Sequence, residues 1–162
     1  MGSACHHHEA EDGPGLADGA LASALAAAEM RCVTTAERLT PPRRRVLELL
    51  LRADGPRKAY DLIADFGESG APAKPPTVYR ALEFLERLGF AHRIESMNAY
   101  VPCRLNTAEH RAAFLICECC GAAEEFEPDF SVQIAAAAAR GYELRALNLE
   151  ARGLCAGCRA EA

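Results

Sequence analysis

Four of the eight cysteines in this chain fall into two matched pairs. Cys117 and Cys120 form one C-x-x-C motif, and Cys155 and Cys158 form another. Two thiolates separated by two residues can bind one metal from a tight turn, and two such turns supply the closed tetrahedral sulfur site that structural Zn²⁺ prefers. A redox dithiol or disulfide bonds are the alternatives, but two matched pairs fit a metal better than one catalytic pair would. We therefore predict a structural zinc at these four cysteines.

A second set of possible metal ligands is spread on both sides of the first C-x-x-C motif. It consists of His92, Cys103, His110 and Glu125. Two imidazoles, a thiolate and a carboxylate make a reasonable tetrahedral site, and the thiolate favours Zn²⁺ over Mn²⁺ or Fe²⁺. Spacing alone is weak evidence for scattered ligands, because a half-buried histidine, a packed cysteine and a loop histidine are all ordinary. A second zinc is therefore a hypothesis at this point.

Length and composition limit the class of protein. The chain has 162 residues, half of them hydrophobic, which is enough for one ordinary domain or two small ones. No apolar run approaches the length of a membrane span, and the acidic N-terminus lacks the basic start of a secretory signal, so we expect no membrane association. Eight cysteines in such a chain favour a reducing compartment and metal thiolates. We expect a cytoplasmic protein.

Charge is distributed unevenly along the chain. The overall net charge is −5, but residues 38–104 carry +4, whereas residues 1–37 carry −5 and residues 105–162 carry −4. A basic middle between acidic ends is the asymmetry expected when only one module contacts phosphate. Many helical surfaces carry a similar excess, so the charge alone does not establish nucleic-acid binding.

The basic middle has the element order of a winged helix-turn-helix. Apolar residues at helical spacing, with prolines at two helix starts, predict four helices, and a hairpin around residues 96–98 follows them. The predicted helices are 16–36, 41–53, 59–66 and 75–88, and the predicted strands are 90–95 and 99–103. Thr40 is the expected N-cap of the second helix. Three helices followed by a hairpin are typical of winged-helix DNA-binding domains.

The remainder predicts a smaller module. Strands at 112–117, 122–126 and 142–151, with a helix at 128–140 closed by Gly141, bury too little core to be stable alone. The predicted zinc ties the first strand to the last, and dimerisation through the sheet would help further. The fold class is therefore α+β, an N-terminal winged helix-turn-helix domain followed by a small α/β dimerisation domain with a structural zinc. The expected divisions are a disordered segment 1–15, a DNA-binding domain 16–103, a hinge 104–111 and a dimerisation domain 112–162.

The helix that begins at Pro75 offers side chains for reading DNA. In helix-turn-helix proteins the first residues of the second helix reach base edges in the major groove. Arg80 is the best candidate for a bidentate contact to guanine, because its guanidinium matches the two acceptors of that base. The other candidates are Tyr60, Lys74, Thr77 and Tyr79. The alternative is an amphipathic helix with ordinary surface charges.

Several runs of residues resemble the ferric uptake regulator family. They are Leu39–Pro41, Ala59–Leu62, Lys74–Leu85, Gly89–Ser96, Phe114–Gly121 and Gly153–Cys158. The resemblance covers about residues 20–160 and is closest to the zinc uptake regulator branch. Cys103 separates that branch from iron and peroxide sensors, which generally use harder ligands there.

This resemblance implies a function and a mechanism. It implies a zinc-responsive transcriptional repressor, not an enzyme, that binds double-stranded operator DNA as a homodimer and controls zinc-uptake genes. It implies two zincs per chain: a structural one at the four paired cysteines, and a regulatory one at the hinge bound by His92, Cys103, His110 and Glu125. It also points to Tyr60 and Arg80 as base contacts. Zinc would favour the closed arrangement of the two domains over looser ones.

Two alternative functions are retained. A regulator of the same family could respond to iron or peroxide. A zinc or thiol oxidoreductase could use Cys119 or one of the C-x-x-C pairs, although it would need an exposed pair at a helix start. The N-terminal Cys5–His8 segment is given no defined site.

Overall fold

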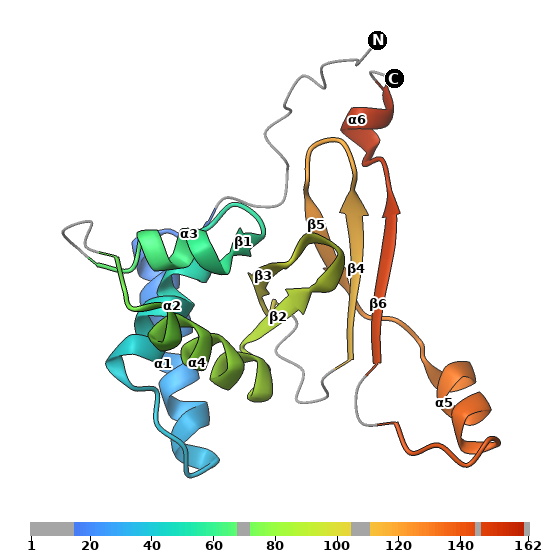
Figure 1. Ribbon diagram of the computed structural model, residues 1–162, viewed down its shortest axis with the longest axis horizontal. Coiled ribbons are helices and arrows are strands. Elements are labelled where there is room, and N and C mark those ends of the chain that lie inside the picture. Colours follow the sequence, from blue (N-terminus) through green and yellow to red (C-terminus); the bar gives the residue numbers. More distant parts are fainter. Residues whose placement is uncertain (1–14, 68–71, 105–110, 145–146, 161–162) are drawn as a thin grey trace.

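The computed structural model describes residues 15–67, 72–104, 111–144 and 147–160, and its arrangement is shown in Figure 1. The N-terminal half is a group of helices with a small sheet at its edge. Its elements are α1 (Asp18–Thr34), α2 (Pro41–Leu51), β1 (Arg57–Lys58), α3 (Ala59–Ala64), α4 (Pro75–Arg87), β2 (Ala91–Ile94), the 3-10 turn η1 (Glu95–Met97) and β3 (Ala99–Pro102). The strand order in this sheet is β1-β3-β2, and both pairings are antiparallel. The helix-helix-hairpin order therefore confirms the predicted winged helix.

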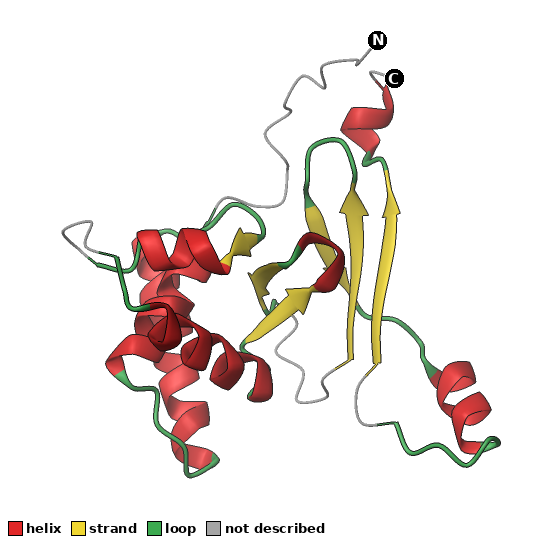
Figure 2. Ribbon diagram, in the orientation of Figure 1, coloured by secondary structure: helices red, strands yellow, loops and turns green. Residues whose placement is uncertain are grey.

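The C-terminal half is a second three-stranded sheet with two short helices. Its elements are β4 (Arg111–Cys117), β5 (Ala123–Phe126), α5 (Ser131–Ala138), β6 (Leu147–Gly153) and α6 (Ala156–Ala160). β4 lies in the centre, antiparallel to β5 and parallel to β6. Helix α5 projects away from this sheet, whereas α6 lies beyond the end of β6 (Figures 1 and 2).

The helical core forms because apolar residues repeat at helical spacing in three helices. Their fully buried side chains are Val46 and Leu50 of α2, Leu62 of α3, and Val78, Leu82 and Leu85 of α4. Prolines occupy the first helical positions of α2 and α4, where a missing N–H costs nothing. This core fixes the direction in which the exposed face of α4 points.

Two polar details concern the ends of α2 and α3. Thr40 occupies the N-cap position of α2 with extended backbone angles, as predicted, although its side chain makes no capping hydrogen bond. The turn after α3 is held by Arg45 of α2. Its guanidinium donates to the carbonyl oxygens of Phe66, at 2.8 Å, and Asp65, at 3.0 Å. These carbonyls would otherwise lack partners at the helix end.

The hairpin of β2 and β3, which is the wing, packs against the C-terminal sheet through a small apolar cluster. Ile94 and Val101 of the wing contact Phe114 and Ile116 of β4, and all four side chains are buried. The predicted hinge, 104–111, falls largely on residues 105–110, which lie outside the described residues, as do residues 1–14 of the predicted disordered segment. The predicted domain boundaries remain predictions.

The element boundaries from the sequence are close, with three corrections. The last strand is β6, beginning at Leu147 instead of the predicted Tyr142, because the chain after Gly141 first passes through irregular structure. The two-residue strand β1 and the short helix α6 were not predicted. In the part of the chain that the structure describes, no helix has the length and apolar character needed to span a membrane.

Candidate functional site

The four paired cysteines converge at one end of the C-terminal sheet. Cys117 ends β4, Cys120 lies in the following turn, and Cys155 and Cys158 lie at the start of α6. Their four sulfurs all lie within 4.8 Å of one another. The Sγ atoms of Cys120 and Cys155 are 3.9 Å apart, about the edge length of a tetrahedron whose metal–sulfur bonds are roughly 2.3 Å. This spacing is far longer than a disulfide bond, so the geometry fits a metal.

The turns that present these cysteines are built by backbone hydrogen bonds. The N–H of Gly121 donates to the carbonyl of Cys117 at 3.0 Å, and Gly121 itself has φ +77°, a conformation that glycine adopts without strain. The N–H of Cys155 points at the sulfur of Cys117 at 3.4 Å, and the N–H of Cys158 points at that of Cys155 at 3.5 Å. Donors aimed at sulfur favour the thiolate form. Cys119, between the ligands of the first pair, is not one of the four.

The electrostatics of this cluster also fit a cation. Burial raises the pKa of the Cys117 thiol, but the backbone N–H groups of Cys120, Cys155 and Cys119 outweigh it and lower this pKa to about 6. Burial and the neighbouring thiols raise the pKa of Cys158 to about 12. Adjacent thiolates repel one another, so all four can ionise only when positive charge lies between them. A bound Zn²⁺ supplies that charge.

A second cluster joins the two sheets. It consists of His92 on β2, Cys103 just after β3 and Glu125 on β5, and one ligand atom from each lies within 4.8 Å of the others. The sulfur of Cys103 is 3.9 Å from Oε1 of Glu125. The other carboxylate oxygen of Glu125 accepts a 2.8 Å hydrogen bond from the N–H of Arg104, which orients the carboxylate. The predicted fourth ligand, His110, lies outside the described residues.

The imidazole of His92 carries the strongest sign that a cation belongs in this cluster. Its Nε2 lies 3.1 Å from Oε1 of Glu125, yet this buried atom makes no properly aligned hydrogen bond. Burial lowers the pKa of His92, but the acidic groups of Cys103 and Glu125 outweigh burial and raise it to about 9. An imidazole nitrogen, a thiol and a carboxylate that lie within 4.8 Å of one another suit a metal ion, which takes the place of the proton on His92.

The side chains predicted to meet DNA lie on the exposed surface of α3 and α4. Tyr60 is 78% exposed and Tyr79 is 53% exposed, although both are large aromatic residues. Arg80 and Lys74 are exposed and Thr77 is half-buried at the start of α4. Exposed aromatic and cationic side chains at a helix N-terminus can contact phosphate and base edges. The structure thus leaves all five candidates accessible.

Two functional contacts escaped the sequence analysis. The guanidinium of Arg43, on α2, lies 3.5 Å from the ring centroid of the buried Phe84 of α4, which fixes the position of α4 on α2. Glu150, on β6, accepts hydrogen bonds from the backbone of the wing turn η1. In both contacts the residues that meet are far apart in the sequence, so no local motif could have indicated either contact.

Comparison with known proteins gives one family. The model of the ferric uptake regulator family matches residues 34–152. The zinc uptake regulation protein of Escherichia coli (strain K12) is 46% identical over 137 residues, which cover 83% of this chain and 80% of that protein. The ferric uptake regulation protein of Synechococcus elongatus is 29% identical over 75% of this chain and 85% of its own length.

Solved structures agree with the sequence comparison. A zinc uptake regulator complexed with zinc and DNA has a TM-score of 0.82 and 42% identity, covering 87% of this chain and 96% of that one. The holo form of XcZur has a TM-score of 0.78 and 45% identity, covering 85% and 98% of the two chains.

Proposed function

We propose, since this chain belongs to the ferric uptake regulator family, that it is a zinc-responsive transcriptional repressor that controls zinc-uptake genes. Its DNA-binding form is a zinc-loaded homodimer on double-stranded operator DNA. The observation that carries this proposal is the second cluster, because His92 belongs to the wing and Glu125 to the C-terminal sheet. A cation between them links the DNA-binding half to the other half of the chain.

The two metal clusters have different roles in this proposal. The four cysteines can supply all four ligands of a tetrahedral site and join the end of β4 to α6, so they hold a structural zinc. The second cluster, with His110 as a proposed fourth ligand, holds the regulatory zinc. When bound there, zinc supplies a bridge between residues of both halves. The proposed hinge at 104–111 lets the halves change their separation, and the cluster residues favour the separation that suits an operator.

The homodimer is supported by an apolar surface on the C-terminal half. None of the residues of α5 is buried, and Val132 on that helix is 72% exposed. Tyr142 is 71% exposed and Leu149, on the sheet, is 40% exposed. An apolar helix with no buried residue among those described needs a partner, and a second copy related by a two-fold axis supplies the same surface. The two copies of α4, one from each protomer, are then about one DNA turn apart, roughly 34 Å.

We assign Tyr60 and Arg80 to base contacts and Lys74, Thr77 and Tyr79 to phosphate or thymine contacts. We also propose that the chain acts in the cytoplasm and has no catalytic activity. The oxidoreductase alternative needs an exposed dithiol, whereas the four cysteines converge and Cys117 and Cys158 are each only 5% exposed. Cys103 disfavours iron or peroxide sensing, because a thiolate makes the regulatory site softer than Fe²⁺ or Mn²⁺ prefers.

Fluorescence anisotropy on a labelled zinc-uptake promoter, titrated with buffered free Zn²⁺, tests the function. We expect tight DNA binding that appears with zinc and is lost with a chelator. The variant Cys103→Ser should remain a folded dimer that retains the structural zinc but needs much more free zinc to bind DNA. The matched control is Cys32→Ala, which removes a buried thiol outside both clusters and should respond as wild type does. Equal DNA affinity with and without zinc would refute the proposal.

A further inference from the structure

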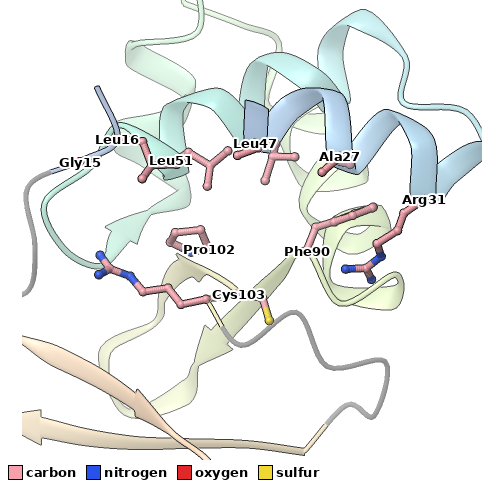
Figure 3. A pocket seen from close by; sticks show the side chains of 12 residues that line it. Gly15, Leu16, Ala27, Arg31, Leu47, Leu51, Phe90, Pro102 and Cys103 are labelled. Carbon is pink, nitrogen blue, oxygen red and sulfur yellow. The ribbon is translucent and has the colours of Figure 1, made fainter. Parts of the chain in front are cut away.

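A cavity of about 460 Å³ lies between the first two helices and the end of the wing. Its volume is within the range of small-molecule sites, which run from roughly 300 to 1,000 Å³. Leu47, Leu51 and Ala27 line the helical side, and Pro102 and Phe90 line the opposite side (Figure 3). Most of the lining is apolar. Of the residues in the two metal clusters, Cys103 lies on the wall of this cavity.

The cavity exists because α1 presents small side chains to α2. Ala24, Ala27 and Ala28 are three of its lining residues, and alanine leaves space that a larger residue would fill. Gly15 lines the other end of the cavity, and its N–H donates to the carboxylate of Asp54 at 2.7 Å. A side chain at Gly15 would meet the backbone oxygen of Arg52 at 1.9 Å, so only glycine allows this approach.

Arg31 supplies an unsatisfied cationic group to this apolar cavity. Its guanidinium stacks on Phe90, 4.3 Å from the ring centroid, and Nη2 donates to the carbonyl of Leu88. Its Nη1 is buried and has no hydrogen-bond partner. Among the described residues no carboxylate pairs with it, although a buried donor left unpaired is costly. A second arginine, Arg104, also lines the cavity.

We infer that this cavity binds a small monocarboxylate with an apolar body, such as a medium-chain fatty acid. The carboxylate pairs with the guanidinium of Arg31, which the stacking on Phe90 and the bond to Leu88 already hold in place. The apolar body lies along the alanine face of α1 and against Leu47 and Leu51. The ligand would lie against Cys103, the same cysteine that the regulatory cluster uses, so this site adjoins the proposed regulatory zinc site.

Isothermal titration calorimetry of the full-length, zinc-loaded protein tests the inference, with octanoate as the probe and 1-octanol as its uncharged counterpart. We expect octanoate to bind one site per chain and 1-octanol to bind at least tenfold more weakly. Arg31→Gln should weaken octanoate binding at least tenfold. The matched control is Arg87→Gln, which removes another arginine stacked on a phenylalanine ring, 5.4 Å from the centroid of Phe84, and should bind octanoate as wild type does.

A second variant covers the case in which Arg31→Gln fails to fold. Ala24→Phe fills the cavity from α1 while leaving both arginines in place, and it should abolish octanoate binding in a protein that still binds two zincs. Three results would overturn the inference: no octanoate binding by the wild-type protein, equal affinity for octanoate and 1-octanol, or undiminished octanoate affinity in Ala24→Phe.

Discussion

The carboxylate of Glu150 accepts a 2.7 Å hydrogen bond from the backbone N–H of Glu95, and thereby joins the last strand of the C-terminal sheet to the turn of the wing. The N–H of Ser96 donates to the other carboxylate oxygen at 3.1 Å. The two N–H groups lie at the start of η1, where they have no helical partner of their own. Glu150 therefore fastens the same two parts of the chain that the second metal cluster links, without taking part in that cluster.

Replacing Glu150 by glutamine should raise the zinc concentration needed for DNA binding. The amide removes the charge and one of the two acceptors, a loss of about 1–2 kcal/mol, equivalent to roughly five- to thirty-fold in an equilibrium constant. Anisotropy titrations with buffered free Zn²⁺ measure the shift. Glu143→Gln is the matched control, because Glu143 is an exposed acidic residue of the same half. An unchanged zinc requirement in Glu150→Gln would show that this contact does not restrict the wing.

The same contact makes a prediction about pH. Burial raises the pKa of Glu150, but hydrogen bonds from Ser96 and Glu95 outweigh it and lower the pKa. Because the pKa of Glu150 is lower in the folded protein, the ionised carboxylate stabilises the fold. This stabilisation is complete above the pKa in the unfolded chain, about 4.3, and is lost as the pH falls through the pKa in the folded protein.

Thermal melts of wild type and Glu150→Gln, in matched buffers across this range, measure the effect as a difference. The difference in melting midpoint should be constant from pH 6 to 7 and should shrink as the pH falls below about 4. Zinc loss at low pH affects both proteins alike, so the difference isolates Glu150. A difference that grows toward low pH would contradict the assigned direction.

The structural zinc makes a prediction about stability. Cys120→Ser removes one of four ligands, and binding energy at such a site is folding energy. A loss of about 3 kcal/mol would lower the melting midpoint by roughly 6–12 °C in a chain of this size. Native mass spectrometry should show one zinc fewer per chain. Cys32→Ala should keep both zincs, and a Cys120→Ser protein that melts like wild type would exclude a structural role for the cysteine cluster.

Local patterns explain what the sequence could predict. The run of apolar residues from Val78 to Leu85 has one period and one buried face, so α4 follows from it directly. Both C-x-x-C pairs are local motifs whose spacing reflects a turn. By contrast, β1 has only two residues and exists because Arg57 and Lys58 pair with β3, which no short window contains. The helix α6 begins among the metal ligands, where turn chemistry obscures helical periodicity.

Non-local contacts explain what the sequence could not predict. His92, Cys103 and Glu125 were named as possible ligands, but only the packing of the wing on the C-terminal sheet brings them together. Glu150 and Arg31 have no motif at all, because their partners are backbone groups and rings more than fifty residues away. The position of His110 stays a prediction.

Arg80 and Lys74 should contribute to DNA binding in different ways. A bidentate contact from Arg80 to guanine is worth about 1–3 kcal/mol, so Arg80→Ala should weaken operator binding roughly five- to 150-fold and relax the preference at one base pair. Lys74→Ala should weaken binding to all sequences about equally and reduce the slope of log affinity against log salt by about one per protomer.

Anisotropy titrations at several salt concentrations, on the operator and on a scrambled duplex, separate the two effects. Arg140→Ala, on the C-terminal half, is the control and should change neither quantity. If Arg80→Ala instead weakened both duplexes equally, Arg80 would be a phosphate contact, and sequence reading would belong to other residues of α3 and α4.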